Sequence, residues 1–309
     1  PQGAVVGGVI KDRTVLTRAL SDLKRTQKGF SYAHAALPEE AGYVFTMMVP
    51  ISQDRAQILS MIEFGLEDRI PLSPNETVFD FDIIHSDGAS GQAEIAVVAF
   101  PKDIAESYAA VFAAAGIELL SLEIEARSIA RAIGVQSSDG TVELLVDFGR
   151  TRTGLAILRS GLPIFTSTVE VGGDGITKLL MERLSVSKEE ADAFKNEHGI
   201  FSTNEKGAEA ITGVAAALAD EVARLYHYWD TRRDDKGDRI ATVSRVVLAG
   251  GSSNLKGLPE YIASKVQAPT ERADMWVNVC DMDEYIPPID RRTSFSYSTA
   301  IGLALRSSI

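Results

Sequence analysis

An aspartate at the end of an apolar, strand-like run is the first residue of this sequence that is placed for chemistry. Asp147 follows the apolar residues 144–146, and a short turn and a second apolar run come after it. The turn contains Gly149, Arg150, Thr151 and Arg152. A carboxylate held at the end of a buried strand can reach a hydrated Mg²⁺, and the N–H groups and hydroxyls of such a turn can face phosphate. Two guanidiniums beside one loop favour an anion, although a plain β-hairpin with an aspartate-initiated turn explains the pattern equally well.

Small residues follow two further apolar runs. Gly172 and Gly173 come after the run that starts at residue 163. Gly250, Gly251 and Ser252 come after the run that ends at residue 249. Paired glycines at the carboxyl end of a strand leave room for a flat group beside the backbone, and open α/β sheets bind ligands at such strand ends. A Gly-Gly turn alone is common, but these two together with the Asp147 turn favour a ligand site.

The remaining residue types form no other catalytic motif. The four histidines stand at no metal-ligand spacing, and the single cysteine, Cys280, can complete neither a zinc site nor an internal disulfide. The sequence has no Gly-rich loop ending in Lys-Ser or Lys-Thr and no Gly-x-Ser-x-Gly turn. Cys280 closes a strand-like run, 277–280, which we expect in the core, and a lone thiol suits a reducing compartment.

Composition sets limits on the class of protein. The chain has 309 residues, with 31 basic against 43 acidic side chains and a net charge of −12. This length fits about two domains of roughly 150 residues each, or one two-lobed unit. A hydrophobic content of 45% with 24% charged residues is globular and excludes a disordered chain. The acidic balance argues against a sequence-independent nucleic-acid binder, and no apolar run approaches the roughly 18 residues of a membrane-spanning helix.

Hydrophobic periodicity predicts two units that are joined by a polar linker at residues 137–140. Before the linker the predicted elements are a helix at 11–27, strands at 32–37 and 43–50, a helix at 54–68, a hairpin of 77–84 and 93–100, a helix at 101–115, a strand at 117–122 and a helix at 125–133. After it come strands at 142–146, 153–158 and 163–171, helices at 176–184, 188–197 and 207–232, a strand at 245–249, and helices at 258–266 and 298–305. The residues from about 43 to 119 thus resemble a compact α+β insert.

This order of motifs resembles the actin-like ATPase superfamily and, within it, the PilM family of type IV pilus assembly proteins. The FtsA cell-division proteins are more distant. The segments that carry the resemblance are residues 35–39, 62–63, 67–68, 79–82, 115–117, 123–126, 172–177, 221–224 and 297–304. Each is short, but together they cover nearly the whole chain.

The resemblance implies an α/β fold, actin-like and ribonuclease H-like, with two lobes around a nucleotide cleft. Residues 1–38 would form part of subdomain 1A, 39–118 the inserted α+β subdomain 1C (an SHS2 domain), and 119–139 the return to 1A. Residues 140–309 would form the second lobe, with subdomain 2B at about 186–240 within 2A, and the C-terminal helix. The chain starts at Pro1 without an initiator methionine, so we expect the family's N-terminal phosphate-binding hairpin to be missing.

The resemblance also implies ATP and Mg²⁺ as ligands. Asp147 would hold Mg²⁺ through water. The other implied contacts are Gly149, Arg150 and Thr151 at the β- and γ-phosphates with Arg152 beside them, Gly172 and Gly173 on the ribose-phosphate side, and Gly250, Gly251 and Ser252 at the adenosine. Phe148 and the two arginines stand where related members have Gly-rich sequence, so we expect ATP binding with at most weak ATPase activity.

The resemblance favours an adaptor over an enzyme. As an adaptor, the protein would be cytoplasmic and peripheral at the inner membrane, in contact with the membrane only through a partner. It would hold the N-terminal cytoplasmic peptide of a bitopic, PilN-like protein in a groove between subdomains 1A and 1C, with ATP tuning the shape of the groove. Other pilus assembly proteins and further copies of the chain are additional expected partners.

Three alternatives stay open from the sequence. An actin-fold kinase would need a separate catalytic base, and no residue can be named for that role. An FtsA-like protein would need a terminal amphipathic helix, whereas this chain ends a few residues after its last predicted helix. A GspL-like cytoplasmic domain of type II secretion would have a similar fold.

Overall fold

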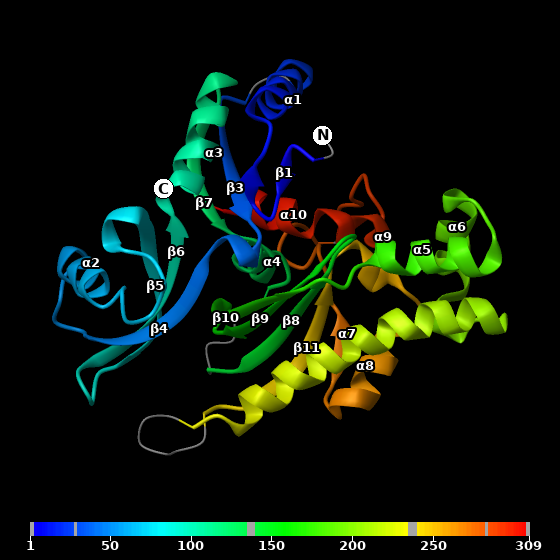
Figure 1. Ribbon diagram of the computed structural model, residues 1–309. Coiled ribbons are helices and arrows are strands. Elements are labelled where there is room, and N and C mark those ends of the chain that lie inside the picture. Colours follow the sequence, from blue (N-terminus) through cyan, green and yellow to red (C-terminus); the bar gives the residue numbers. More distant parts are fainter. Residues whose placement is uncertain (1–2, 28–29, 135–139, 234–239, 282–283, 307–309) are drawn as a thin grey trace.

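A five-stranded sheet forms the centre of the molecule (Figure 1). The computed structural model describes residues 3–27, 30–134, 140–233, 240–281 and 284–306. The strands of this sheet are β8 (Val142–Phe148), β9 (Thr153–Arg159), β10 (Leu162–Val169), β11 (Val243–Ala249) and β12 (Thr270–Arg272). Their order is β10-β9-β8-β11-β12, with β8, β9 and β10 antiparallel and with β11 and β12 parallel to β8. The carboxyl ends of β8 and β11 therefore lie at the same edge of the sheet.

Most residues of β8 are apolar, on both faces of the strand, and both faces are covered. Leu144 and Val146 pack into a core cluster with Leu218 and Val222 of the long helix α7, whereas Leu145 packs on the other face with Ile129. A strand buried on both sides reads as a continuous apolar run rather than an alternating one. The helices of this half are α5 (Gly173–Leu184), α6 (Lys188–His198), α7 (Glu205–Thr231), α8 (Leu258–Val266) and α9 (Arg291–Ser294).

A parallel pair of strands, β3 and β7, anchors the first half of the chain. The elements around this pair are β1 (Val5–Val6), β2 (Val9–Ile10), α1 (Arg13–Thr26), β3 (Tyr32–Leu37), α3 (Lys102–Ala114), β7 (Glu118–Ile124) and α4 (Glu125–Ala132). The last helix, α10 (Ser298–Ala304), returns from the second half and packs on α4 (Figure 1). The two halves are therefore joined by the end of the chain as well as by the connection from α4 to β8.

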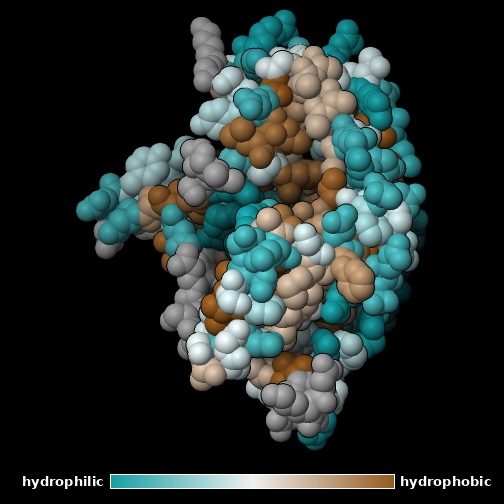
Figure 2. All heavy atoms as spheres, turned by 90° about the vertical axis from the view of Figure 1, so that its left-hand side faces the viewer, coloured by the Kyte–Doolittle hydropathy of each residue, from teal (hydrophilic) through white to brown (hydrophobic). Residues whose placement is uncertain are grey.

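A separate three-stranded antiparallel sheet projects from this first half (Figure 1). It consists of β4 (Tyr43–Pro50), β5 (Thr77–Asp87) and β6 (Gln92–Pro101) in the order β4-β6-β5, with α2 (Arg55–Phe64) on one face. Ile95 and Val97 of β6 pack with Ile58 and Ile62 of α2, which leaves the alternate residues of β6 on the opposite face. Figure 2 looks onto this side of the molecule and shows hydrophobic groups exposed among polar ones.

The predicted helices and strands are observed in the predicted order. The helix predicted at 54–68 ends at Phe64, where Gly65 follows as its C-cap. Strands β1, β2 and β12 and helix α9 were not predicted. The expected core strand at 277–280 is wrong: this segment is a turn in which Cys280 N–H donates to the Trp276 carbonyl, Val277 is 56% exposed, and Cys280 is half-buried. Among the described residues, no helix is both long and apolar enough to cross a bilayer.

Close packing of α10 on α4 gives a test of this arrangement. A Cβ at Gly302 would overlap the carbonyl oxygen of Ser128, whereas a Cβ at Gly213 in α7 would meet nothing within 4 Å. We expect Gly302→Ala to lower the free energy of unfolding by about 1–3 kcal/mol through overpacking. We expect Gly213→Ala to raise it by about 1 kcal/mol through helix propensity. Urea denaturation measures both, and equal effects of the two substitutions would contradict this packing.

Candidate functional site

Asp147 lies at the carboxyl end of β8, between the neighbouring strands β9 and β11. Its Cα pairs in register with Gly154 of β9 and with Ala249 of β11. The side chain is half-buried. The turn that follows is closed by the N–H of Gly149, which donates to the carbonyl of Arg152 at 3.0 Å. The strand order thus places the Asp147 turn beside the turn that follows β11.

Hydrogen bonds connect the three turns that the sequence singled out. Gly173 N–H donates to the carbonyl of Gly149 at 3.1 Å, and Asp174 N–H donates to the carbonyl of Arg150 at 2.8 Å. From the third turn, the hydroxyl of Ser252 also donates to the Gly149 carbonyl, at 2.8 Å. The structure therefore brings the predicted residues together around one backbone carbonyl.

Two glycines are required for this convergence. Gly250 has φ of +82°, a conformation that side chains with a Cβ rarely adopt, and a Cβ there would lie 2.6 Å from the carbonyl oxygen of Phe148. At Gly172 a Cβ would lie 2.5 Å from the carbonyl oxygen of Arg150. Both separations are far below van der Waals contact, so these positions admit only glycine without movement of the turns.

A cavity of about 440 Å³ opens at these turns. Six of the ten predicted site residues line it: Asp147, Gly149, Arg150, Gly250, Gly251 and Ser252. Four more lining residues were not predicted: Phe295, Ser296, Ser298 and Thr299. The last four precede or begin α10, and the only sequence signal for them is a group of hydroxyl side chains before the final helix.

The other predicted residues lie outside the lining of this cavity. Gly172 and Gly173 support the Asp147 turn from behind, and Thr151 is exposed. Arg152 points to carboxylates of the first half of the chain: its guanidinium lies 3.4 Å from Glu40 and 3.2 Å from Glu125. The charge of Arg152 is therefore already balanced by protein groups rather than presented to the cavity.

Three carboxyl groups meet between the two halves of the molecule beside this cavity. Glu39 is 5% exposed; its Oε1 accepts from Ala126 N–H at 2.9 Å, and its Oε2 has no partner among the described residues. Burial, together with the charges of Glu125 and Asp147, raises the pKa of Glu39 to about 8. Burial and the charge of Glu125 raise the pKa of Asp147 to about 7 against the opposing effect of Arg152. This corner is therefore short of positive charge.

Sequence reasoning did not assign Glu39 or Glu125 to the site, although a signal for both is present. Each follows an apolar strand directly or after one proline: Glu125 follows β7, and Glu39 follows β3 and Pro38. Asp147 stands at the end of β8 in the same way, so acidic residues at strand ends were a shared pattern. Among the described residues, no three His, Cys, Asp or Glu side chains are arranged to hold a metal ion directly.

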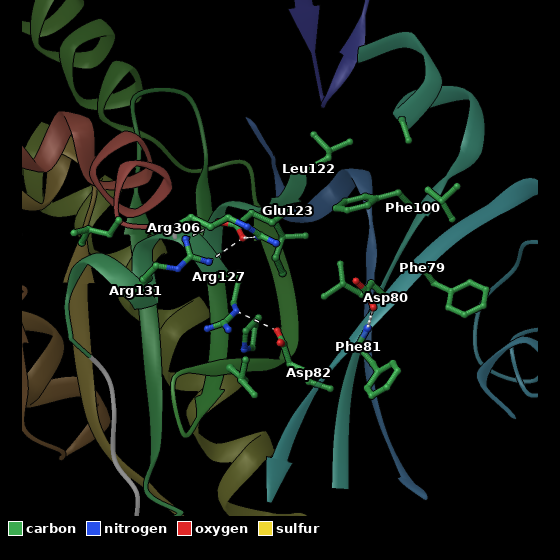
Figure 3. Close-up of a pocket in the computed structure, with 18 residues that line it drawn as sticks. Phe79, Asp80, Phe81, Asp82, Phe100, Leu122, Glu123, Arg127, Arg131 and Arg306 are labelled. Carbon is green, nitrogen blue, oxygen red and sulfur yellow. Dashed lines mark hydrogen bonds and ion pairs between the residues drawn. The ribbon is translucent and has the colours of Figure 1, made fainter. Parts of the chain in front are cut away.

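A second and larger cavity, of about 650 Å³, lies where the three-stranded sheet meets β7 and α4 (Figure 3). We call it the β5–β7 groove. Its lining consists of residues 78–82 of β5, Ala96, Val98 and Phe100 of β6, Ala105 of α3, residues 122–124 of β7, Arg127 and Arg131 of α4, Leu162 and Pro163 of β10, and Leu305 and Arg306 after α10. All three parts of the fold therefore contribute to this groove.

Arginines from α4 dominate one wall of the β5–β7 groove (Figure 3). Arg131 makes two hydrogen bonds of 2.9 Å to the carboxylate of Glu123, which also accepts from Ser128 and pairs with Arg306. Burial would raise the pKa of Glu123, but the hydrogen bonds from Arg131 and Ser128 hold it below its ordinary value. Arg127 lies 3.3 Å from Asp82 across the groove and donates to the carbonyl of Gly161 in the second half at 3.2 Å.

The pKa of Glu39 predicts a pH dependence of stability. Because its pKa is about 8 in the folded protein and ordinary in the unfolded chain, the contribution of Glu39 is present at low pH and is lost as pH rises from about 4.5 to 8. We therefore expect the free energy of unfolding of Glu39→Gln, relative to the unsubstituted chain, to rise between pH 5 and pH 8. The slope is at most about 1.4 kcal/mol per pH unit.

Urea denaturation at several pH values measures this difference. The exposed Glu182 in α5 supplies the control, and Glu182→Gln should show no such slope. A difference between Glu39→Gln and the unsubstituted chain that is constant with pH would contradict a protonated Glu39.

Comparison with known proteins agrees with the family resemblance. A family model described as type IV pilus assembly protein PilM matches residues 1–308. The cell division protein FtsA of Agrobacterium fabrum is 28% identical over 189 residues, and so is FtsA of Rhizobium radiobacter. Each of these two matches covers 54% of this chain and 41% of the FtsA protein, so this chain spans less than half of the length of the curated relatives it matches.

Solved structures of similar fold cover almost the whole chain. A structure of a PilM-PilN type IV pilus biogenesis complex is similar with a TM-score of 0.79 at 20% identity, over 99% of this chain and 88% of that one. MreB5 of Spiroplasma citri bound to AMPPNP is similar with a TM-score of 0.56 at 15% identity, over 97% of this chain and 77% of that one. These likenesses confirm the predicted actin-like, two-lobed α/β fold.

Proposed function

Because the chain belongs to the family of type IV pilus assembly protein PilM, we propose that it is a pilus assembly adaptor that binds the N-terminal peptide of a PilN-like membrane protein in the β5–β7 groove. The groove carries this proposal. It is larger than the cavity at Asp147, it is bordered by two sheets, and its lining combines apolar side chains with arginines. The fold it belongs to is similar to that of a protein solved as a complex with PilN.

In this proposal the three-stranded sheet belongs to subdomain 1C, residues 39–118. Strands β3 and β7 with their helices belong to subdomain 1A, residues 1–38 and 119–139. The central sheet belongs to the second lobe, residues 140–309, with subdomain 2B at about 186–240. The β5–β7 groove then lies between 1A and 1C, where the resemblance to the PilM family places the partner peptide.

The cavity at Asp147 is the proposed nucleotide site, with ATP as a conformational ligand. Support comes from the convergence of Asp147, Gly149, Gly250, Gly251 and Ser252, and from the fold's likeness to an MreB5 solved with AMPPNP. The hydroxyls of Ser296 and Thr299 add polar groups to the lining.

The acidic corner beside that cavity fits a hydrated Mg²⁺. Oxygen ligands are those Mg²⁺ prefers, and Mg²⁺ keeps most of its water shell in proteins. Asp147 would hold the ion through water, and buried Glu39, whose Oε2 has no partner among the described residues, adds a second acidic group to this corner. A bound divalent cation would add positive charge beside these groups and would draw the phosphates toward the turn.

Helix α4 gives the two sites a physical connection. Its first residue, Glu125, pairs with Arg152 of the turn that follows Asp147, and Arg127 and Arg131 enter the groove from the same helix. A shift of the second lobe on ATP binding would therefore be passed to the groove through α4. The protein would be cytoplasmic and peripheral at the inner membrane, held there by its partner.

The family model covers residues 1–308, whereas the FtsA match covers about half of the chain, which favours a pilus role over an FtsA-like one. A GspL-like role would place the same fold in type II secretion. A kinase would need a catalytic base in the cavity. Glu125 is an acidic residue near Asp147, but it does not line the cavity and is paired with Arg152. We therefore propose nucleotide binding with at most weak hydrolysis. Self-association and other pilus partners are further proposals.

Substitution of Asp147 tests the nucleotide site. We expect Asp147→Ala in the full-length protein to weaken Mg-ATP binding at least tenfold, because the hydrated cation loses its protein partner. Asp220→Ala, at an exposed aspartate of α7, serves as the control and should bind as the unsubstituted protein does. Calorimetric titration with Mg-ATP measures both affinities, and an unchanged affinity in Asp147→Ala would remove this residue from the site.

Two apolar residues on β5 provide a matched test of the groove. Val78 lines the groove and is 36% exposed, whereas Ile83 on the same strand is 55% exposed and lies outside the lining. We expect Val78→Lys to weaken binding of a PilN-type N-terminal peptide at least tenfold and Ile83→Lys to change it less than twofold. Calorimetry with the synthetic peptide measures both, and equal effects would place the peptide elsewhere.

A further inference from the structure

We propose that the partner peptide binds in the β5–β7 groove as an added β-strand along the free edge of β5, so that main-chain hydrogen bonds supply much of the recognition. This inference rests on the proposed function, which places the peptide in the groove. It adds the conformation of the peptide, the protein backbone that binds it, and the pattern of peptide positions that matter.

Strand β5 has a free edge. The order β4-β6-β5 gives β5 one neighbour. No backbone hydrogen bond joins residues 78–82 to another element among the described parts of the chain. In an antiparallel sheet, every second residue of an edge strand points its N–H and C=O groups away from its neighbour. Such a row of groups is a template for a further strand.

The free edge is regular where it borders the groove. The pairing of β5 with β6 runs without interruption from Thr77 to Ile83, and the register shift lies between Ile83 and His85, beyond the groove. Bulges commonly block the edge of a sheet against further pairing. Here the bulge lies beyond residues 78–82, which remain a regularly paired segment of about 17 Å at 3.3–3.4 Å per residue.

Consecutive residues of β5 line the groove, although their side chains alternate between the two faces of the sheet. Phe79 and Phe81 pack against the α2 side, where the Arg55 guanidinium lies 4.9 Å from the Phe81 ring centre. Figure 3 shows both rings pointing away from the arginine wall. At these two positions it is therefore the backbone, and not the side chain, that borders the groove.

One edge group already has a substitute partner. The N–H of Phe81 donates to Oδ1 of Asp80 at 2.7 Å (Figure 3), and we infer that this N–H faces the free edge of β5. The carboxylate oxygen accepts the hydrogen bond that the carbonyl of an added strand would otherwise accept. Backbone N–H groups alternate in direction along a strand. If the N–H of Phe81 faces the free edge, the N–H of Phe79 faces it too, and the backbones of these two residues are the ones that would bind an added strand.

Strand β7 is the less suitable edge. It contributes three residues to the lining, against five from β5. The carboxylate of Glu123 on β7 is already occupied by Arg131, Ser128 and Arg306. Leu122 and Ile124 instead supply apolar surface, together with Val98 and Phe100 of β6. These surfaces would receive alternate side chains of a strand held on β5.

A scan of backbone N-methylation tests the proposal. The probe is a synthetic N-terminal PilN-type peptide, unmodified or N-methylated at one residue at a time, titrated into the full-length protein by calorimetry. An added strand uses every second N–H of the peptide, so we expect losses of about tenfold at alternate positions over about five residues. Methylation between those positions should change the affinity less than threefold.

The outcomes separate this inference from the proposed function. No binding of the unmodified peptide would overturn the proposed function. Tight binding of the unmodified peptide without an alternating pattern would overturn strand addition and leave the function in place. Amide hydrogen exchange gives an independent readout: the N–H groups of Phe79 and Phe81 should become protected by the peptide, and the neighbouring N–H groups, already paired with β6, should change little.

Discussion

The meeting of three turns at the carbonyl of Gly149 is the constraint on which the rest of this structure depends. The turns after β8 and β11 and the start of α5 come close enough that Gly172 and Gly250 have no room for a Cβ. Parallel pairing of β11 with β8 makes this possible, because it places both strand ends at one edge of the sheet. The cavity at Asp147 follows directly from that arrangement.

Ion pairs connect the turn after Asp147 to the first half of the chain. Arg152 pairs with Glu40 and Glu125, while Glu39 and Asp147 are left with raised pKa values. A site with excess carboxylate favours a cation, and a cation favours a polyphosphate. Glu125 begins α4, and Arg127 of the same helix reaches the β5–β7 groove. A ligand in the cavity at Asp147 and a peptide in the groove would therefore both act on the position of α4.

Much of this was predictable because strong periodicity and glycine placement are local properties of the sequence. Strands at 32–37 and 43–50 and the helix at 258–266 were predicted with their observed bounds, and the three turns at Asp147, Gly172 and Gly250 do converge. Arg152 was expected near phosphate, but its guanidinium points to the carboxylates of Glu40 and Glu125. These two residues are distant in sequence, so no local pattern could reveal the contact. A groove between subdomains was expected only from the family resemblance, because the walls of the β5–β7 groove come from seven separate segments. The segment 277–280 shows the opposite failure: alternating valines resemble a strand, yet within the described part of the chain no strand pairs with them.

We propose that the cavity at Asp147, as the nucleotide site, and the β5–β7 groove are coupled through α4. This coupling is tested most directly by measuring the affinity of the PilN-type peptide with and without saturating Mg-ATP, and the affinity of Mg-ATP with and without saturating peptide, on the full-length protein. We expect each ligand to change the affinity of the other by the same factor, about fivefold or more, because coupling between two sites is reciprocal. If both ligands bind and neither affinity changes, the two sites are independent and the claim is wrong.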